Sequence, residues 1–172
     1  MGTKFVAEPL SREKIRKFTL ELRKLLKLEN EIYFPVIPFL EVILPTIDPN
    51  FEFHIVTGEE LPNKYAVAYP EENLIKIRED VYERAINGVP RDRFTIAHEI
   101  GHLILHTDNR IALARDMDMV NIPSYRDPEW QANTFAGELL VPYELTMDMS
   151  LKEIEINCGV SKYVAKIQID KR

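Results

Sequence analysis

The chain has 172 residues, a formal net charge of −6 and a single cysteine. One hydrophobic core can support a domain of this length without disulfide bonds, and a lone thiol with no export signal favours a reducing cytoplasm. The acidic balance argues against a broad, sequence-independent grip on nucleic acid. The most apolar stretch, residues 33–47, is too short for a membrane span and is interrupted by Glu41 and three prolines.

The first fifty residues predict two helices. In residues 9–28, Pro9 and Ser11 suit the start of a helix, and apolar side chains recur at helical spacing. We expect the basic outer face of this helix to be solvated. Residues 35–49 predict a second, shorter helix bounded by prolines.

The pattern then changes from helical to strand periodicity. Residues 51–57, 64–70 and 73–79 alternate or run apolar, with glycine, proline and asparagine between them. We expect three short antiparallel strands. Residues 80–88 follow as a helix that Gly88 closes.

Helical patterns occupy the rest of the chain. A helix is predicted from about 92 to 106, a polar connector over 107–126, and a capped helix over 127–142 that starts with Asp-Pro and stops at a proline. Residues 143–172 predict two or three short helices. The fold class is therefore α+β, with a small antiparallel three-stranded sheet packed on a mainly helical core. We expect a single domain, 1–172, with an N-terminal helical part (1–50), a sheet (51–80), central helices (80–142) and C-terminal helices (143–172).

The segment "FTIAHEIGHLILH" places polar side chains in an apolar helix. His98 and His102 are four residues apart and share one helix face, so both imidazoles can bind one zinc ion, while Glu99 can reach a water molecule beside it. The alternatives to a metal site are a chance occurrence of the H-E-x-x-H pattern and a pair of core histidines that hydrogen-bond to carbonyl groups. The apolar flanks favour a metal, because burying three unpartnered polar groups is costly. Gly101 indicates a close approach by another segment.

Zinc needs a third protein ligand. Glu129 is the best candidate, since it shares a helix face with Asn133 and small alanines would let the two helices come close. His106 lies about 12 Å along the axis from His98, too far to join, so it should cap its helix or hydrogen-bond behind a ligand. Glu138 falls on the opposite face from Glu129 and is predicted to be solvated. The connector offers further possible ligands: Asp108, Asp116 and Asp118.

Two motifs carry a family resemblance. "RFTIAHEIGHLILH" (93–106) followed by "EWQANTFAGELLVP" (129–142) resembles the ImmA/IrrE family of intracellular zinc peptidases. The resemblance implies a gluzincin-like site with one Zn²⁺ per chain, bound by His98, His102 and Glu129, and Glu99 as the catalytic base. Many such enzymes have an aspartate where this chain has Asn133. The Asn133 side chain could still accept a hydrogen bond from a histidine, but it is uncharged. A glycine also replaces the alanine usual after "FA".

The resemblance also implies a function. Known members cut DNA-binding repressors and so switch on mobile-element or stress-response genes, which predicts a cytoplasmic zinc endopeptidase whose partner is a helix-turn-helix repressor. A second oxyanion donor is expected, and the candidates are Tyr143, Arg93, Tyr125 and His106. The strand at 73–79 either lies along the cleft and pairs with an extended peptide or simply packs in the sheet.

Three other functions compete with this one. The fold could sequester a repressor without cutting it, with zinc serving structure, or it could hydrolyse non-peptide amides. Residues 154–169 have the glycine-in-turn pattern of a helix-turn-helix with Lys162 and Lys166 on the second helix, but the acidic chain favours two packing helices over DNA binding. Cys158 is expected to be an inert packing residue.

Overall fold

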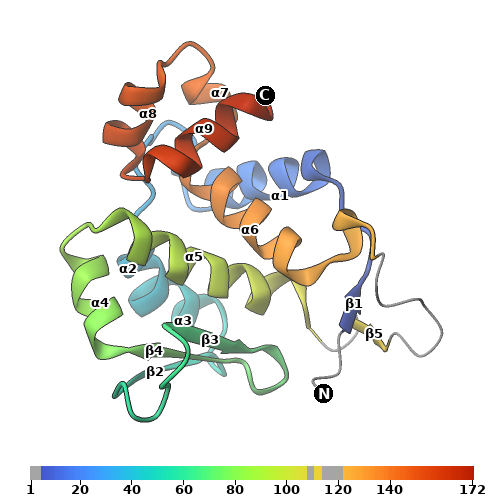
Figure 1. Ribbon diagram of the computed structural model, residues 1–172, viewed down its shortest axis with the longest axis vertical. Coiled ribbons are helices and arrows are strands. Elements are labelled where there is room, and N and C mark those ends of the chain that lie inside the picture. The colour runs from blue at the N-terminus through green and yellow to red at the C-terminus, as the bar shows by residue number, and fades with distance from the viewer. Residues whose placement is uncertain (1–4, 108–110, 114–121) are drawn as a thin grey trace.

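The computed structural model describes residues 5–107, 111–113 and 122–172. It is a mainly helical α+β structure with a small mixed sheet (Figure 1). The strands are β1 (Phe5–Ala7), β2 (Glu52–Val56), β3 (Ala66–Tyr69), β4 (Leu74–Arg78) and β5 (Ile111–Leu113). The longer helices are α1 (Arg12–Leu25), α4 (Glu79–Ile86), α5 (Pro90–Leu105), α6 (Pro128–Leu140), α8 (Leu151–Cys158) and α9 (Lys162–Asp170). The shorter helical pieces are α2 (Val36–Pro38), η1 (Phe39–Ile43), α3 (Leu44–Ile47), η2 (Pro70–Glu72), η4 (Ser124–Arg126) and α7 (Tyr143–Thr146).

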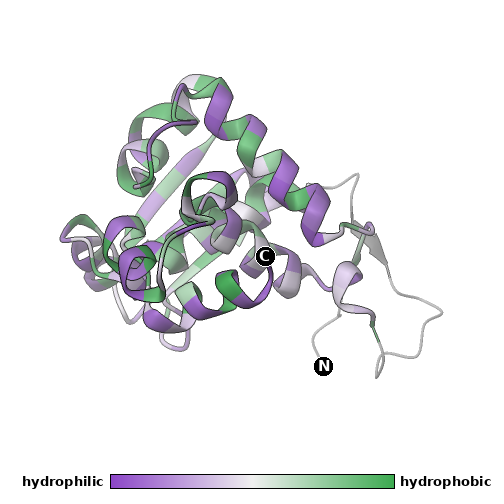
Figure 2. Cartoon of the chain, turned by 90° about the horizontal axis from the view of Figure 1, so that it is seen from above, coloured by the Kyte–Doolittle hydropathy of each residue, from purple (hydrophilic) through white to green (hydrophobic). Residues whose placement is uncertain are grey.

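The predicted helices form, and local chemistry explains their ends. Ser11 caps α1 by accepting from the backbone N–H of Lys14, and Asp127 caps α6 in the same way. Gly159 ends α8 in the left-handed conformation, with φ of +60°. The predicted helix over 35–49 is a continuous helical run whose middle, η1, has π-type hydrogen bonds. Each long helix carries polar and apolar residues along its length (Figure 2).

The sheet differs from the predicted antiparallel one. Its order is β2-β4-β3, and β2 pairs with β4 in parallel while β3 and β4 are antiparallel. The nine residues between Val56 and Ala66 are long enough to carry the chain past the position of β4, so β2 and β3 need not be neighbours. β4 is consequently the central strand, and its Leu74, Ile75 and Ile77 are buried. Outside this sheet, β1 pairs with β5.

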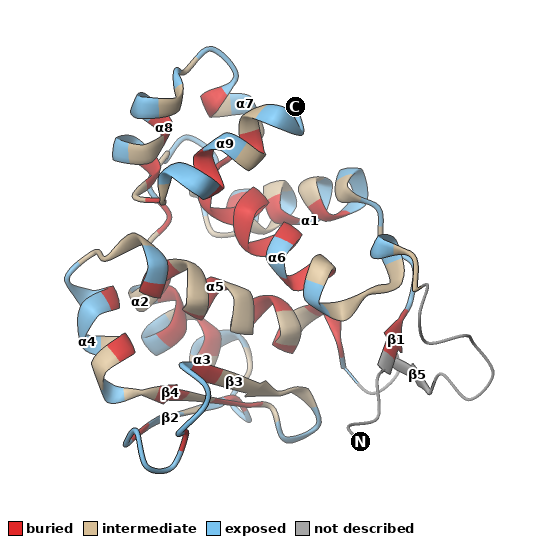
Figure 3. Ribbon diagram, in the orientation of Figure 1, coloured by how far each residue is buried: buried red, intermediate tan, exposed pale blue. Residues whose placement is uncertain are grey.

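The core lies between the sheet and a stack of helices. α5 packs on β3 and β4 with one face and on α6 with the other, and α6 in turn packs on α1 (Figure 1). α6 is buried along most of its length (Figure 3), because it contacts α5, α1 and α9. This stacking fixes α5 and α6 against each other, which is what positions the site described below.

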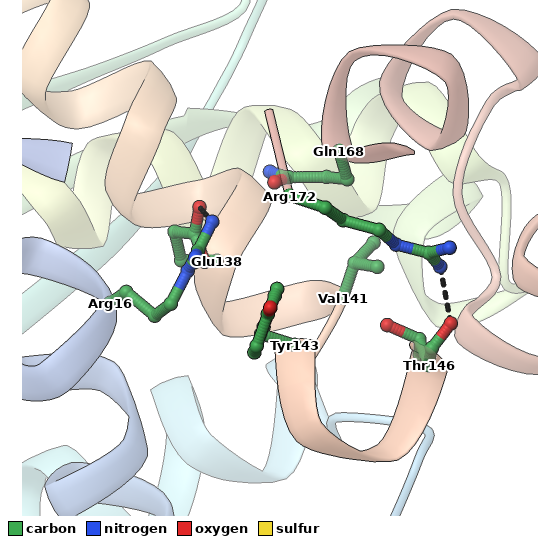
Figure 4. A pocket seen from close by; sticks show the side chains of 7 residues that line it. All are labelled: Arg16, Glu138, Val141, Tyr143, Thr146, Gln168 and Arg172. Carbon is green, nitrogen blue, oxygen red and sulfur yellow. Dashed lines mark hydrogen bonds and ion pairs between the residues drawn. The ribbon is translucent and has the colours of Figure 1, made fainter. Parts of the chain in front are cut away.

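Glu138 is not solvated, and the basic face of α1 is not simply exposed. The Glu138 side chain is 1% exposed and accepts from Arg12 at 2.7 Å and from Arg16 at 2.8 Å. Figure 4 shows Arg16 from α1 beside Glu138 from α6, with Tyr143 close by. Arg23 is also buried and donates to backbone carbonyls, including that of Leu139. The face opposite Glu129 is therefore the interface with α1.

Among the described residues, none of the helices combines the length and the apolar composition needed to span a bilayer.

Candidate metal centre

Three predicted ligands converge where α5 meets the first turn of α6. The Nε2 atoms of His98 and His102 are 3.0 Å apart. Glu129 places Oε1 at 3.2 Å from the His102 Nε2 and Oε2 at 3.3 Å from the His98 Nε2. Within the described part of the chain, this is a group that could hold a metal ion.

The donor set fits a tetrahedral ion. With metal–donor bonds of about 2.0–2.2 Å, the donors of a tetrahedral site lie about 3.3–3.6 Å apart, slightly more than the 3.0–3.3 Å between these nitrogen and oxygen atoms. Two imidazole nitrogens and a carboxylate are also typical protein ligands of zinc, and a three-ligand set leaves the fourth position for water or substrate. Nitrogen lone pairs aimed at one point repel each other unless a cation or a proton lies between them. The arrangement of His98, His102 and Glu129 is thus complementary to a cation.

Gly101 is what lets α6 come so close to α5. A Cβ added to Gly101 would lie 2.9 Å from Phe135 Cδ1 and 3.3 Å from both the Cα and the carbonyl oxygen of Ala132. The close approach predicted from this glycine is therefore an approach of the α6 backbone. Because Ala132 is one helical turn from Glu129, the contact sets how far the Glu129 carboxylate can reach.

Glu99 lies beside the three ligands and not among them. One of its oxygens accepts a hydrogen bond of 2.6 Å from the backbone N–H of Ala68 in β3. Burial raises the pKa of the Glu99 carboxyl above its ordinary value. A carboxylate with a raised pKa is suited to taking up a proton and giving it back.

Glu129 has the opposite electrostatic environment. Hydrogen bonds with His102 and His98 hold the pKa of Glu129 well below its ordinary value. The carboxylate is consequently ionised throughout the neutral range, as metal binding requires.

Each histidine is supported from behind by a side chain. His98 Nδ1 lies 2.9 Å from Asn133 Oδ1, as expected for a residue four positions after Glu129. His102 Nδ1 lies 3.0 Å from His106 Nδ1, so His106 contacts a ligand and is not itself in the group of three. Burial lowers the pKa of His106 to about 4, which keeps this ring neutral.

The other side chains singled out in the sequence lie elsewhere. Arg93 is buried and donates to the carbonyls of Phe34, Cys158 and Gly159, so it ties α5 to the C-terminal helices. Tyr143 lies in the polar crevice around Glu138 (Figure 4) and not beside the metal group. Neither is placed to stabilise an oxyanion there. Tyr125 is exposed in η4. Three further candidates lie outside the described residues: Asp108, Asp116 and Asp118.

An open groove of about 1140 Å³ runs past the metal group. It is bordered by residues 63–72, which include β3, and by the His98 face of α5. The groove follows consecutive residues of β3 and its flanks, so it can accommodate an extended ligand.

β3, and not β4, forms the wall of the groove. Of the two roles predicted for residues 73–79, packing in the sheet is confirmed and pairing with a peptide is wrong, because β4 is paired on both edges. The register of β3 with β4 directs the backbone N–H and C=O groups of Ala66 and Ala68 away from β4. The N–H of Ala68 donates to Glu99. Side-chain patterns carry no direct signal for such a backbone contact, so the sequence did not reveal it.

The fold and the site together define a class: a mainly helical α+β domain in which two packed helices bring two imidazoles and a carboxylate to one point beside an open groove. The chain belongs to the peptidase family whose model is described as the IrrE N-terminal-like domain, which matches residues 57–157, well over half of its length. The match includes His98, Glu99, His102 and Glu129, and membership of this family suggests a metallopeptidase. No curated protein matches the sequence significantly.

Proposed function

We propose that this protein is a zinc-dependent endopeptidase that cuts a DNA-binding repressor and so relieves repression. The observation that carries the proposal is the convergence of His98, His102 and Glu129 beside Glu99, at the floor of a groove walled by an edge strand. Zinc is favoured because these are the ligands of catalytic zinc sites that leave one position open. The family resemblance supports a repressor as the substrate, and a repressor substrate would in turn support a cytoplasmic enzyme.

An extended peptide can be bound by β3. The outward C=O of Ala68 and the N–H and C=O of Ala66 are free of β4 and can add a strand to the sheet. Such pairing would run the peptide along α5 and past Glu99. Backbone pairing is tolerant of sequence, so the choice of substrate would depend on how well its exposed segment fits the groove.

The catalytic role that we propose for Glu99 is proton transfer between the attacking water and the leaving group. A bound zinc ion would polarise the scissile carbonyl and lower the pKa of the attacking water. The Glu99 carboxylate takes a proton from that water and delivers it to the departing amide nitrogen. The N–H of Ala68 holds one Glu99 oxygen in place, which leaves the other oxygen for the proton. The ring nitrogens of His106 face Gln131 and His102, so this side chain is not placed to donate to an oxyanion either.

The test is cleavage of a repressor encoded beside this gene, by co-expression and by incubation of the purified proteins. The zinc-loaded protein should trim the repressor, and a chelator should stop the reaction. Glu99→Gln should bind zinc as well as the original protein does but cut at least about 10²-fold more slowly. The matched control is Glu83→Gln, an exposed residue of α4.

The alternative function is a binding module that sequesters the repressor without cutting it. In that case the original protein and Glu99→Gln would bind the repressor equally, and neither would yield a trimmed product. That result would reject the peptidase proposal while leaving the metal site in place.

A further inference from the structure

We propose that Gln131, acting through His106, fixes the tautomer in which His102 offers its Nε2 to the metal. Gln131 and His106 are then positioning residues, and the inference rests on the metal site of the proposed function. It follows from three hydrogen bonds in series, each of which determines where the next proton lies.

The first step is the orientation of the Gln131 amide. This side chain is completely buried, and its Nε2 lies 2.7 Å from the carbonyl oxygen of Glu8 and 2.8 Å from that of Tyr125. Carbonyl oxygens can only accept, so the NH₂ group must face both of them. The Gln131 Oε1 is therefore directed at His106 without ambiguity.

The second step is the tautomer of His106. Its Nε2 lies 2.9 Å from Gln131 Oε1, which can only accept, so this nitrogen carries a proton. The ring is 2% exposed, and its hydrogen-bond partners in the described part of the chain include no carboxylate that would stabilise a cation. A neutral ring protonated at Nε2 has a lone pair at Nδ1, and that lone pair points at His102.

The third step fixes His102. The two Nδ1 atoms of His102 and His106 are 3.0 Å apart, a distance that requires one proton between them. Because His106 supplies the lone pair, the proton is on His102 Nδ1. A neutral His102 then has its lone pair on Nε2, the atom that faces Glu129 and the other histidine. With the reverse tautomer, a proton on Nε2 would block metal binding.

His98 lacks an equivalent constraint. Its Nδ1 meets Asn133 Oδ1, but Asn133 is exposed, and no bond from its own amide nitrogen to a carbonyl is found within the described residues. That amide can therefore turn over at little cost. Glu8, by contrast, belongs to the N-terminal segment, outside the region matched by the family model. The segment before α1 thus acts, through Gln131 and His106, on His102 and not on His98.

The experiment reads the tautomers directly. In protein labelled with ¹⁵N at histidine and stripped of metal by a chelator, long-range ¹H–¹⁵N spectra distinguish Nδ1–H from Nε2–H imidazoles. We expect Nδ1–H for His102 and Nε2–H for His106. An unprotonated Nδ1 on His102 in the unaltered protein would overturn the proposal, whatever its variants do.

Variants provide the second measurement. Gln131→Met keeps the volume but removes all three hydrogen bonds, and Gln168→Met is the matched control, because Gln168 is another buried glutamine, on α9 and away from the site. Gln131→Met should mix the tautomers of His102 and lower the zinc affinity, measured by competition with a chromophoric chelator, by about 10–100-fold relative to the control. Equal affinities for the two variants would refute the proposal.

These readouts are independent of catalysis. If the zinc-loaded protein cut nothing while the tautomers were as expected, the proposed function would fail and the positioning role would stand. If cleavage were observed but the Nδ1 of His102 carried no proton, the positioning role would fail and the proposed function would stand.

Discussion

Gly101→Ala tests whether the packing of α5 on α6 sets the metal geometry. The new methyl group would meet Phe135 at 2.9 Å and the backbone of Ala132 at 3.3 Å. A phenyl ring can shift by a few tenths of an ångström, but the Ala132 backbone can move only together with α6. Since Glu129 is in the first turn of that helix, the separation should be transmitted to its carboxylate.

Two opposing contributions set the expected stability. Alanine is favoured over glycine in a helix by about 1 kcal/mol, whereas overpacking a well-filled core costs about 1–3 kcal/mol. We expect a net loss of about 1 kcal/mol, or roughly 2–4 °C in Tm for a domain of this size. A small displacement of one ligand should also weaken zinc binding, by about 10-fold, comparable to the loss of an outer hydrogen bond to a ligand.

The assay pairs thermal unfolding in the presence of a chelator with a zinc competition titration. Gly58→Ala is the control, because a Cβ there has Arg78 Nε at 4.0 Å as its nearest neighbour. If Gly101→Ala raised the Tm and bound zinc as tightly as the control does, the helix contact would not determine the ligand geometry, and our reasoning would be refuted.

Three further predictions concern single side chains. Glu138→Leu leaves two partly exposed arginines of α1 without their shared carboxylate. The free energy of unfolding should fall by about 2–3 kcal/mol and the Tm by about 5–10 °C. A change in Tm of less than about 1 °C would contradict a role of Glu138 in anchoring α1. Asn133→Asp should increase zinc affinity by up to about 10-fold in the chelator competition, because a charged acceptor makes His98 a more basic ligand; unchanged or weaker binding would count against it. Burial raises the pKa of Cys158 to about 11, so the thiol stays protonated at pH 8, and iodoacetamide should label it only after unfolding in urea; rapid labelling of the folded protein would show that it is accessible.

The sequence by itself determined the features that depend on helical geometry. His98 and His102 had to share one face of a helix if residues 92–106 were helical, and Asn133 had to follow Glu129 one turn later. The cap at Asp127 and the left-handed turn at Gly159 are likewise local. Such features involve residues a few positions apart, so the 3.6-residue period is enough to predict them.

The tertiary structure decided everything that depends on which distant segment is the neighbour. A surface position and an interface position look alike in the sequence of a single helix, so Glu138 could not be recognised as the partner of α1 more than 120 residues earlier. The order β2-β4-β3 was hidden for a related reason: alternation shows that a strand exists, not which strand lies beside it. The burial of Gln131 against Glu8, and the hydrogen bond from Ala68 to Glu99, join side chains to backbone groups that every residue possesses. Only the packed chain specifies which of those backbone groups are within reach.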